Sequence, residues 1–372
     1  MNELHTGLLA PGFEPVVELV NNMLAADPDW TFQLVVHTDT QTVVDLHAGA
    51  GYGTALHLQA SATKGVAGLA VAAALQNAGL DVTTPVATLW PEFAAAGKAA
   101  VTVAELLSHQ VGLLRTTGSF TIAEWGEGGA VAADLAAQRP RWAPGRAHGY
   151  HALTIGPLAN EIVHRLTGAP LLEFYDQAIR TSGDIDFWVR LPRDQDHRVR
   201  DVVLPPPVEP VPAPTGSLTD EATGQLDAMG PQNSWINSRE LLVAGVPSVS
   251  GAGTARGLAD VYAAALGLAG RTALLTEDTL AAVTQLQAAG TDLVLGGESR
   301  YAVLFQKPSP TRDFGTAAAF GHDGAGGALA FADPVTRVAF GYVTGRASVP
   351  AGADWRALVL AAEVRRIRLR DC

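Results

Sequence analysis

The hydrophobic pattern of the first eighty residues changes from helical to strand-like and back to helical. Residues 13–27 are predicted to form a helix, and residues 31–38 and 42–47, which are rich in β-branched and apolar side chains, two strands around the polar turn at 39–41. The segment from Ser61 to about Ala78 contains no proline, is apolar nearly all round between Val66 and Leu75, and is followed by Gly79. This pattern predicts a buried central helix whose first turn contains Ser61.

The middle of the chain has few strand-like segments. Thr102 and Glu105 have the spacing of a capping box, which predicts a short helix ending near residues 108–109. Residues 204–214 contain six prolines and are expected to be extended, most simply as a surface crossover. After this region, strand-like sequence patterns occur again only near the C-terminus. There we expect helices over 255–268 (with Thr254 as N-cap), 276–289 and 354–370, and strands over 302–306, 327–332 and 337–344.

Strands at both ends of the chain with helices between them predict an α+β fold. The two ends are expected to share one antiparallel sheet flanked by helices. We therefore expect residues 1–80 and 250–372 to form a sheet-containing lobe and residues 81–249 an inserted, mainly helical lobe. An active site is expected where these lobes meet.

The amino-acid composition limits which binding partners the protein could have and in which cellular compartment it is expected. Of 372 residues, 48% are hydrophobic and 17% charged, and the net charge of −12 argues against a nucleic-acid or anionic-membrane partner. The single cysteine, Cys372, allows no internal disulfide. The N-terminus lacks a signal-peptide pattern, and the longest apolar run, Gly65–Leu75, is too short to span a bilayer. These features predict a cytoplasmic protein that acts on small molecules.

The most informative local motif is Ser61-x-x-Lys64. A serine hydroxyl needs a neighbouring base to become a good nucleophile, and residues three apart on a helix lie on one face. The positive end of the helix dipole would also favour negative charge developing at Ser61. The pair is typical of a covalent acyl-transfer site, although by itself it is better explained as a helix cap beside a solvated lysine.

Two further segments complete a possible site. Tyr150 follows a Pro-Gly turn and precedes a predicted helix, and a nearby lysine would lower the pKa of its phenol and make it a base. Residues 320–327 are glycine-rich, which lets the backbone approach a substrate and expose N–H groups, as an oxyanion hole requires. A structural role for Tyr150 alone would be about as probable.

Taken together, these motifs resemble the serine β-lactamase-related superfamily, in its class C β-lactamase and family VIII carboxylesterase branch. The resemblance rests on Ser61-x-x-Lys64, the segment 106–113, Tyr150 and His322-x-Gly324, in this order. It implies a β-lactamase/DD-peptidase-like fold, Ser61 as nucleophile, and Lys64 with Tyr150 as the proton relay. It also places His322, Asp323 and Gly324 where related enzymes carry a substrate-binding Lys-Thr-Gly element, and assigns the oxyanion hole to the N–H groups of Ser61 and Ala325.

Two departures from the β-lactamase pattern favour ester substrates. Class C β-lactamases have an asparagine two residues after the tyrosine, where this chain has Ala152. Their Lys-Thr-Gly lysine is replaced by His322, which is at most partly charged at neutral pH. His322 could also be a partner of other site residues rather than a substrate contact. Both changes weaken the expected binding of a lactam antibiotic.

Several other motifs have simpler explanations. His109, His148 and His151 are more often structural, and we expect neither a metal nor a cofactor. The Gly49-x-Gly51-x-Gly53 run is expected to be a turn, and no serine has the glycine spacing of a nucleophile elbow. The favoured function is therefore a serine esterase. An acyltransferase, a weak β-lactamase or peptidase, and a non-catalytic binding or scaffold protein remain alternatives.

Overall fold

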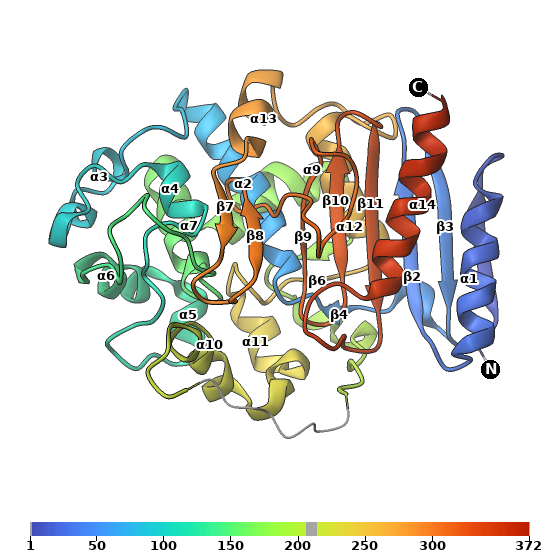
Figure 1. Cartoon of the computed structure of the whole chain (residues 1–372), viewed down its shortest axis with the longest axis horizontal. Coiled ribbons are helices and arrows are strands. Elements are labelled where there is room, and N and C mark those ends of the chain that lie inside the picture. Colours follow the sequence, from blue (N-terminus) through green and yellow to red (C-terminus); the bar gives the residue numbers. More distant parts are fainter. Residues whose placement is uncertain (1, 206–213, 372) are drawn as a thin grey trace.

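The computed structural model describes residues 2–205 and 214–371, so most of the proline-rich segment and Cys372 lie outside the described residues. Its centre is a six-stranded antiparallel sheet with the order β1-β3-β2-β11-β10-β9 (Figure 1). Three strands come from each end of the chain: β1 Leu4–Leu9, β2 Phe32–His37, β3 Thr42–Ala48, β9 Phe320–Asp323, β10 Leu329–Asp333 and β11 Val338–Thr344. Strand β2 pairs with β11, with Val36 opposite Phe340, so the two ends share one sheet as the α+β prediction required.

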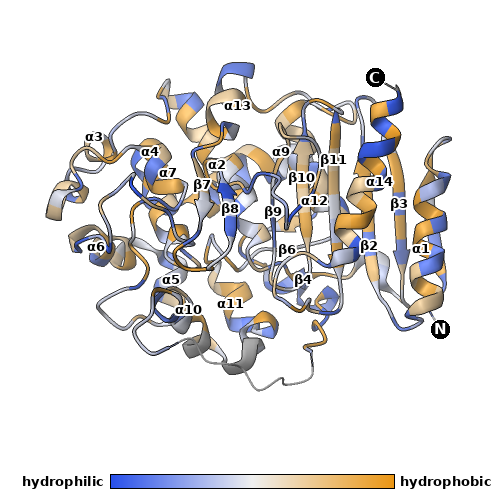
Figure 2. Ribbon diagram, in the orientation of Figure 1, coloured by the Kyte–Doolittle hydropathy of each residue, from blue (hydrophilic) through white to orange (hydrophobic). Residues whose placement is uncertain are grey.

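Side chains along each strand point alternately to the two faces of the sheet, so the sheet separates two hydrophobic cores. Large side chains such as Leu34 and Phe340 point to one face, where they pack with the helices α1 (Glu14–Ala26) and α14 (Trp355–Asp371). Val35 and the small residues at 330, 332 and 339 point to the other face, toward α2 (Ala62–Ala78) and α12 (Ala255–Leu266). In Figure 2, α1 and α14 mix hydrophilic and hydrophobic residues, as helices with one solvated face do.

Helix α2 is the buried centre of the molecule. It has no polar face: every residue from Ala62 to Leu75 is buried. The helix contacts β9 on one side and α7 (Ile155–Thr167) on the other. This all-round burial agrees with the apolar pattern of the sequence, and it fixes the first turn of α2 between the sheet and the helical region.

The helical region between residues 81 and 249 consists of short elements. Besides α7, its α-helices are α3 Val86–Leu89, α4 Val103–Leu107, α5 Ile122–Glu127, α6 Gly129–Ala137, α8 Leu171–Tyr175, α9 Thr181–Gly183, α10 Leu218–Met229 and α11 Arg239–Ala244. The predicted capping box of Thr102 and Glu105 is present at α4. Strands β4 His57–Leu58, β6 Ala252–Gly253 and β5 Phe187–Trp188 form a small second sheet in that order. No described helix is both long and apolar enough to cross a membrane.

The main differences from the sequence predictions lie between residues 276 and 306. Helix α13 is Glu277–Thr284 and ends early, because a hairpin of β7 (Ala288–Thr291) and β8 (Glu298–Tyr301) follows it. The strand predicted over 302–306 is wrong, since the chain turns at Leu304, which has a φ of 60°. This turn is apolar because Leu304 and Phe305 pack against Gly68 of α2. Strand β1 was not predicted, and neither was β9, whose residues were noted only as part of the glycine-rich segment 320–327.

Candidate active site

Ser61 lies directly before α2, in a backbone conformation set by its neighbours. Ala60 has a φ of 47°, a left-handed conformation that costs energy for a residue with a side chain. The Thr63 hydroxyl donates to the Ala60 carbonyl at 2.6 Å and accepts from the Gly251 N–H at 2.9 Å. Ser61 makes no capping hydrogen bond with its side chain, and it lines a pocket of about 180 Å³. Its hydroxyl is therefore available for chemistry.

Lys64 is buried beside Ser61. Its side chain is inaccessible to solvent, and its Nζ lies 3.1 Å from the Ser61 Oγ. The same Nζ donates to the carbonyl oxygens of Ala152 at 2.8 Å and Ser248 at 3.0 Å. Burial lowers the pKa of Lys64 to about 7, against a smaller opposing effect of the Asp323 charge. The amine is therefore partly neutral at physiological pH, as a general base must be.

Tyr150 reaches the same pocket from the loop before α7. The Lys64 Nζ lies 4.9 Å from the centre of its ring, and the phenol hydrogen-bonds the Ser61 side chain. Contrary to the sequence-based expectation, the pKa of Tyr150 is raised, chiefly by burial. Because Lys64 is itself buried and partly neutral, its attraction for a phenolate is weak. The structure thus brings Ser61, Lys64 and Tyr150 together, but with a neutral phenol.

The backbone around Gly324 approaches the segment before Ser61 closely. A Cβ at position 324 would lie 2.1 Å from the Gln59 carbonyl oxygen and 3.3 Å from the Ala62 nitrogen, so only glycine fits there. Ala325 follows and lines the pocket together with Ser61. Within the described chain, the N–H groups of Ser61 and Ala325 donate to no other group. Free N–H groups beside the nucleophile are one requirement of an oxyanion hole.

His322 does not line the pocket. Its side chain is 1% exposed, and its Nδ1 lies 2.7 Å from the Asp323 carbonyl oxygen. Burial lowers its pKa to about 3, so the ring is neutral at physiological pH. Its ring centre lies 6.2 Å from that of Tyr150. The substrate contact predicted for His322 is therefore replaced by a position behind the tyrosine, because strand β9 turns this side chain inward.

Asp323, the next residue, lines the pocket and is held by two side chains that sequence reasoning missed. Arg312 Nε donates to its carboxylate at 2.7 Å, and Gln306 Nε2 does so at 2.9 Å. Burial has the largest single effect and opposes ionisation of Asp323, but the charge and hydrogen bond of Arg312, together with His322 and Gln306, lower the carboxyl pKa overall. Arg312 belongs to an irregular segment before β9, and no motif in the sequence marks it. The charged part of the pocket wall is therefore the Arg312–Asp323 ion pair, whereas related enzymes have the lysine of their Lys-Thr-Gly element.

The three histidines near Tyr150 have structural partners. The His109 Nδ1 accepts from the His151 N–H at 3.0 Å, and the His151 Nε2 accepts from the Leu113 N–H at 3.0 Å. His148 Nε2 lies 2.9 Å from the Ser299 Oγ. These contacts join the loop that carries Tyr150 to its surroundings, in agreement with the structural role expected for these residues.

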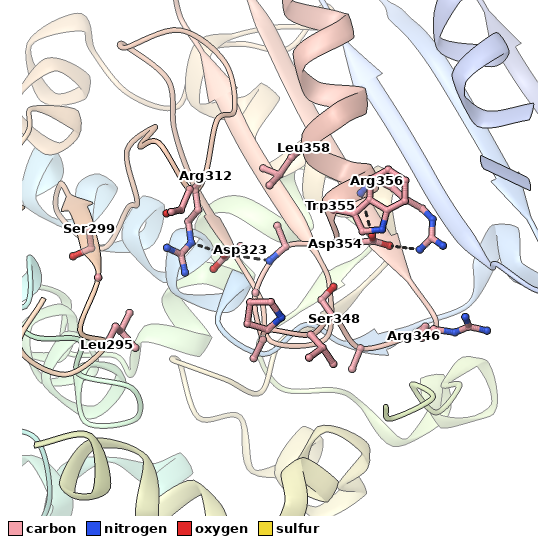
Figure 3. Close-up of a pocket in the computed structure, with 18 of the residues that line it drawn as sticks. Leu295, Ser299, Arg312, Asp323, Arg346, Ser348, Asp354, Trp355, Arg356 and Leu358 are labelled. Carbon is pink, nitrogen blue, oxygen red and sulfur yellow. Dashed lines mark hydrogen bonds and ion pairs between the residues drawn. The ribbon is translucent and has the colours of Figure 1, made fainter. Parts of the chain in front are cut away.

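A larger cavity of about 730 Å³ lies next to the serine pocket (Figure 3). The two share five lining residues, Leu295, Arg312, Asp323, Ala351 and Gly352. In Figure 3 the Arg312–Asp323 ion pair lies between the β8 side, with Leu295 and Ser299, and the segment that leads into α14. A substrate attached to Ser61 could therefore extend past this ion pair into the larger space.

Comparison with known proteins identifies the family. The Beta-lactamase family profile matches residues 31–363, which is most of the chain. The chain belongs to the β-lactamase family. It is a serine hydrolase of the β-lactamase fold. The family assignment agrees with the resemblance inferred from the order of the motifs.

Individual relatives cover nearly the whole chain. EstA from Arthrobacter nitroguajacolicus Rue61a is 36% identical, with a TM-score of 0.91 over 99% of this chain and 100% of EstA. A family VIII carboxylesterase is 30% identical, with a TM-score of 0.84 over 97% of this chain and 100% of the esterase. The esterase/beta-lactamase LipL of Mycobacterium tuberculosis is 28% identical over 92% of this chain and 83% of LipL.

Proposed function

We propose that this β-lactamase-family protein hydrolyses carboxylic esters through an acyl-enzyme on Ser61. The observation that carries the proposal is the Ser61–Lys64 pair, in which a buried amine lies 3.1 Å from the serine hydroxyl. A neutral amine has two N–H groups, which match the two carbonyl oxygens that Lys64 contacts, and one lone pair. That lone pair would accept the hydroxyl proton of Ser61.

In the proposed acylation step, the Ser61 oxygen bonds to the ester carbonyl carbon while its proton passes to Lys64. The N–H groups of Ser61 and Ala325 would stabilise the resulting oxyanion. When the bond to the leaving alkoxide breaks, the neutral phenol of Tyr150 supplies its proton, and the Lys64–Tyr150 pair is restored by the proton taken from Ser61. A water molecule then attacks the acyl carbon, the pair accepts a proton from it, and Ser61 leaves with its hydroxyl reformed.

The shape and charge of the pocket support small, uncharged esters over lactams. The pocket has a volume of about 180 Å³, and one side is lined by Ala152, Leu226 and Trp235. Ala152 offers no amide side chain to a lactam's acylamino group. The polar wall is the closed Arg312–Asp323 pair, in which the positive charge already has a partner. A carboxylate on the substrate would have to compete with Asp323 for Arg312.

The test is a substrate panel with the full chain and its S61A variant. Aryl esters of increasing acyl length, a penicillin and a cephalosporin would be compared by initial rates and intact mass. We expect short-chain esters to be turned over best, lactams slowly or not at all, and a fluorophosphonate probe to label Ser61. Cephalosporin turnover comparable with the best ester would contradict the ester proposal. The absence of both turnover and labelling would favour a non-catalytic binding protein.

Acyl transfer is a second candidate, supported by the larger cavity that adjoins the serine pocket. That cavity has room for an acceptor alcohol or amine, which would replace water in the second step. Product partition with one ester donor and rising concentrations of acceptors distinguishes the two reactions. Saturable capture of most of the acyl group by one acceptor at low millimolar concentration would identify an acyltransferase.

A further inference from the structure

Asp292 is a buried carboxylate outside the set of catalytic groups described above. It directly follows β7 and begins the turn that leads to β8, and its side chain is inaccessible to solvent. In the described part of the chain no arginine, lysine or histidine forms an ion pair with it. A buried charge without a counter-charge is costly unless several hydrogen-bond donors replace its water.

Five donors surround this carboxylate. Its Oδ1 accepts from the N–H groups of Tyr150 at 3.0 Å, Val294 at 2.9 Å and Leu295 at 2.9 Å. Its Oδ2 accepts from the hydroxyls of Ser299 and Tyr301, both at 3.1 Å. Four of these donors are within nine residues of Asp292 and could serve the hairpin alone. The Tyr150 N–H is 142 residues away and links the hairpin to the active-site loop.

The β7–β8 hairpin contacts the loop that carries Tyr150 at further positions. The Leu293 N–H donates to the His148 carbonyl at 3.0 Å, and His148 in turn contacts Ser299. The Tyr301 ring stacks on the Tyr150 ring at 6.2 Å with a 19° interplanar angle. Asp292 is therefore hydrogen-bonded both to the Tyr150 backbone and to the tyrosine that packs on the Tyr150 ring.

The same carboxylate also fixes part of the substrate pocket. The Leu295 N–H donates a hydrogen bond to Asp292, and Leu295 lines both the serine pocket and the larger cavity. Figure 3 shows Leu295 and Ser299 on the side of the cavity formed by the β8 hairpin. One buried side chain thus joins a pocket wall to the main chain of Tyr150, whose phenol contacts Ser61.

We propose that Asp292 is a positioning residue for the reaction, which holds Tyr150 in register with Ser61 through the Tyr150 N–H. The proposal rests on the proposed function, because it uses the role assigned there to Tyr150. Displacement of a reacting group by about 1 Å can cost on the order of 10²-fold in rate, so a group that only positions Tyr150 can matter greatly.

The experiment compares D292A and D292N with a matched control in the full chain. Asp333 is also a fully buried aspartate, and it accepts from the Thr316 N–H, the Thr316 hydroxyl and the Val335 N–H at 2.8–3.0 Å. It lies at the end of β10 and lines neither cavity, so D333N reports the cost of altering a buried carboxylate elsewhere. The substrate is the best aryl ester of the wild type, and D292A and D292N are each made with and without Y150F.

We expect D292A to lower kcat by on the order of 10²-fold. D292N keeps an oxygen for the three N–H groups and should lose only about tenfold. D333N should change kcat by less than about twofold. In the Y150F background, neither D292A nor D292N should lower kcat further, because Asp292 acts on kcat through Tyr150, whereas any effect of the Leu295 wall would appear in KM. Thermal unfolding accompanies each measurement, and if D292A fails to fold, D292N carries the comparison.

An equal loss of kcat with and without Y150F would assign Asp292 a merely structural role and overturn the proposal. Wild-type activity in D292N and D292A would overturn it as well. In both cases the wild type still hydrolyses the ester, so the proposed function stands. A wild type that neither hydrolyses esters nor labels at Ser61 would overturn the proposed function and this inference with it.

Discussion

Two lysines of this protein are shielded from solvent in different regions, and Lys64 lies deeper in the protein than Lys98. Lys64 in α2 and Lys98 near the start of the helical region are both inaccessible to solvent. Each donates to two main-chain carbonyl oxygens, which for Lys98 are those of Ala95 at 2.7 Å and Gln138 at 2.5 Å. Each amine lies over an aromatic ring, Tyr150 at 4.9 Å and Phe93 at 5.3 Å. Burial lowers the pKa of both, to about 7 and about 8.

The difference between the two regions lies in what else the amine can reach. Lys64 has the Ser61 hydroxyl at 3.1 Å and a phenol that contacts the same hydroxyl. Lys98 has a phenyl ring, and in the described chain it hydrogen-bonds no hydroxyl; it ties its own turn to the residue after α6. A lowered pKa is thus a consequence of burial, and a base also requires a nucleophile within reach.

The largest expected effect separates the two lysines by activity. S61A and K64M should each lower kcat/KM by more than about 10³-fold, because nucleophile and base act as a unit. K98M should keep activity and instead lose stability, about 1–3 kcal/mol for each carbonyl left without a donor. Steady-state kinetics and urea unfolding measure the two quantities. A folded K98M protein with little activity would contradict this assignment.

Y150F makes the Lys64 region resemble the Lys98 region, since both amines then lie over a phenyl ring. We expect a loss of activity on the order of 10³-fold with little change in stability, because only the proton-carrying hydroxyl is removed. Rates of ester hydrolysis and of Ser61 labelling would be measured together. Near-normal turnover in Y150F would show that the proposed relay is wrong.

The pH dependence of activity tests which group is the base. If neutral Lys64 accepts the serine proton, kcat/KM should fall about tenfold per pH unit below about pH 7 and be level above it. The buried His151 and His322 have pKa values lowered to about 4 and about 3, so their titration would not produce a decrease in kcat/KM just below pH 7. The decrease below pH 7 should be unchanged in K98M. A profile level from pH 5 to 8 would exclude Lys64 as the titrating base.

The smallest expected effect is on stability above neutral pH. The pKa of Lys98 is about 8 when folded and 10.5 when unfolded, so between these values the unfolded chain binds more protons. Stability contributed by this group therefore rises with pH across that window. Thermal unfolding between pH 8 and 9.5 should show a shallower rise for K98M than for the wild type. Equal slopes would mean that Lys98 is charged in the folded protein.

The sequence predicted those parts of the site that depend on local spacing or on a recognisable order of motifs. Ser61 and Lys64 lie together because three residues make almost one helical turn, and the uniform apolarity of 66–75 already implied burial of α2. The order of motifs led to Tyr150, Gly324 and Ala325. The predicted helices and strands over residues 13–78 and 327–370 agree with the structure to within about two residues, because alternation and helical periodicity are local properties. The exceptions are the missed strands β1 and β9 and the segment between residues 276 and 306.

What only the tertiary structure decided depends on contacts between distant segments. The partners of Asp323, and Asp292 with the four donors from its own hairpin, come from segments that carry no motif, so neither group could be found from the sequence. Residues 302–305 are apolar because they form a turn that is buried against α2. In the sequence, such a buried turn has the same hydrophobic pattern as a strand. Burial also favours the alternative role of His322, a neutral partner behind Tyr150, over a substrate contact, and it reverses the expectation for Tyr150 by raising its pKa. A residue's charge state depends on the dielectric and the neighbours that the folded chain places around it, and these are absent from its local sequence.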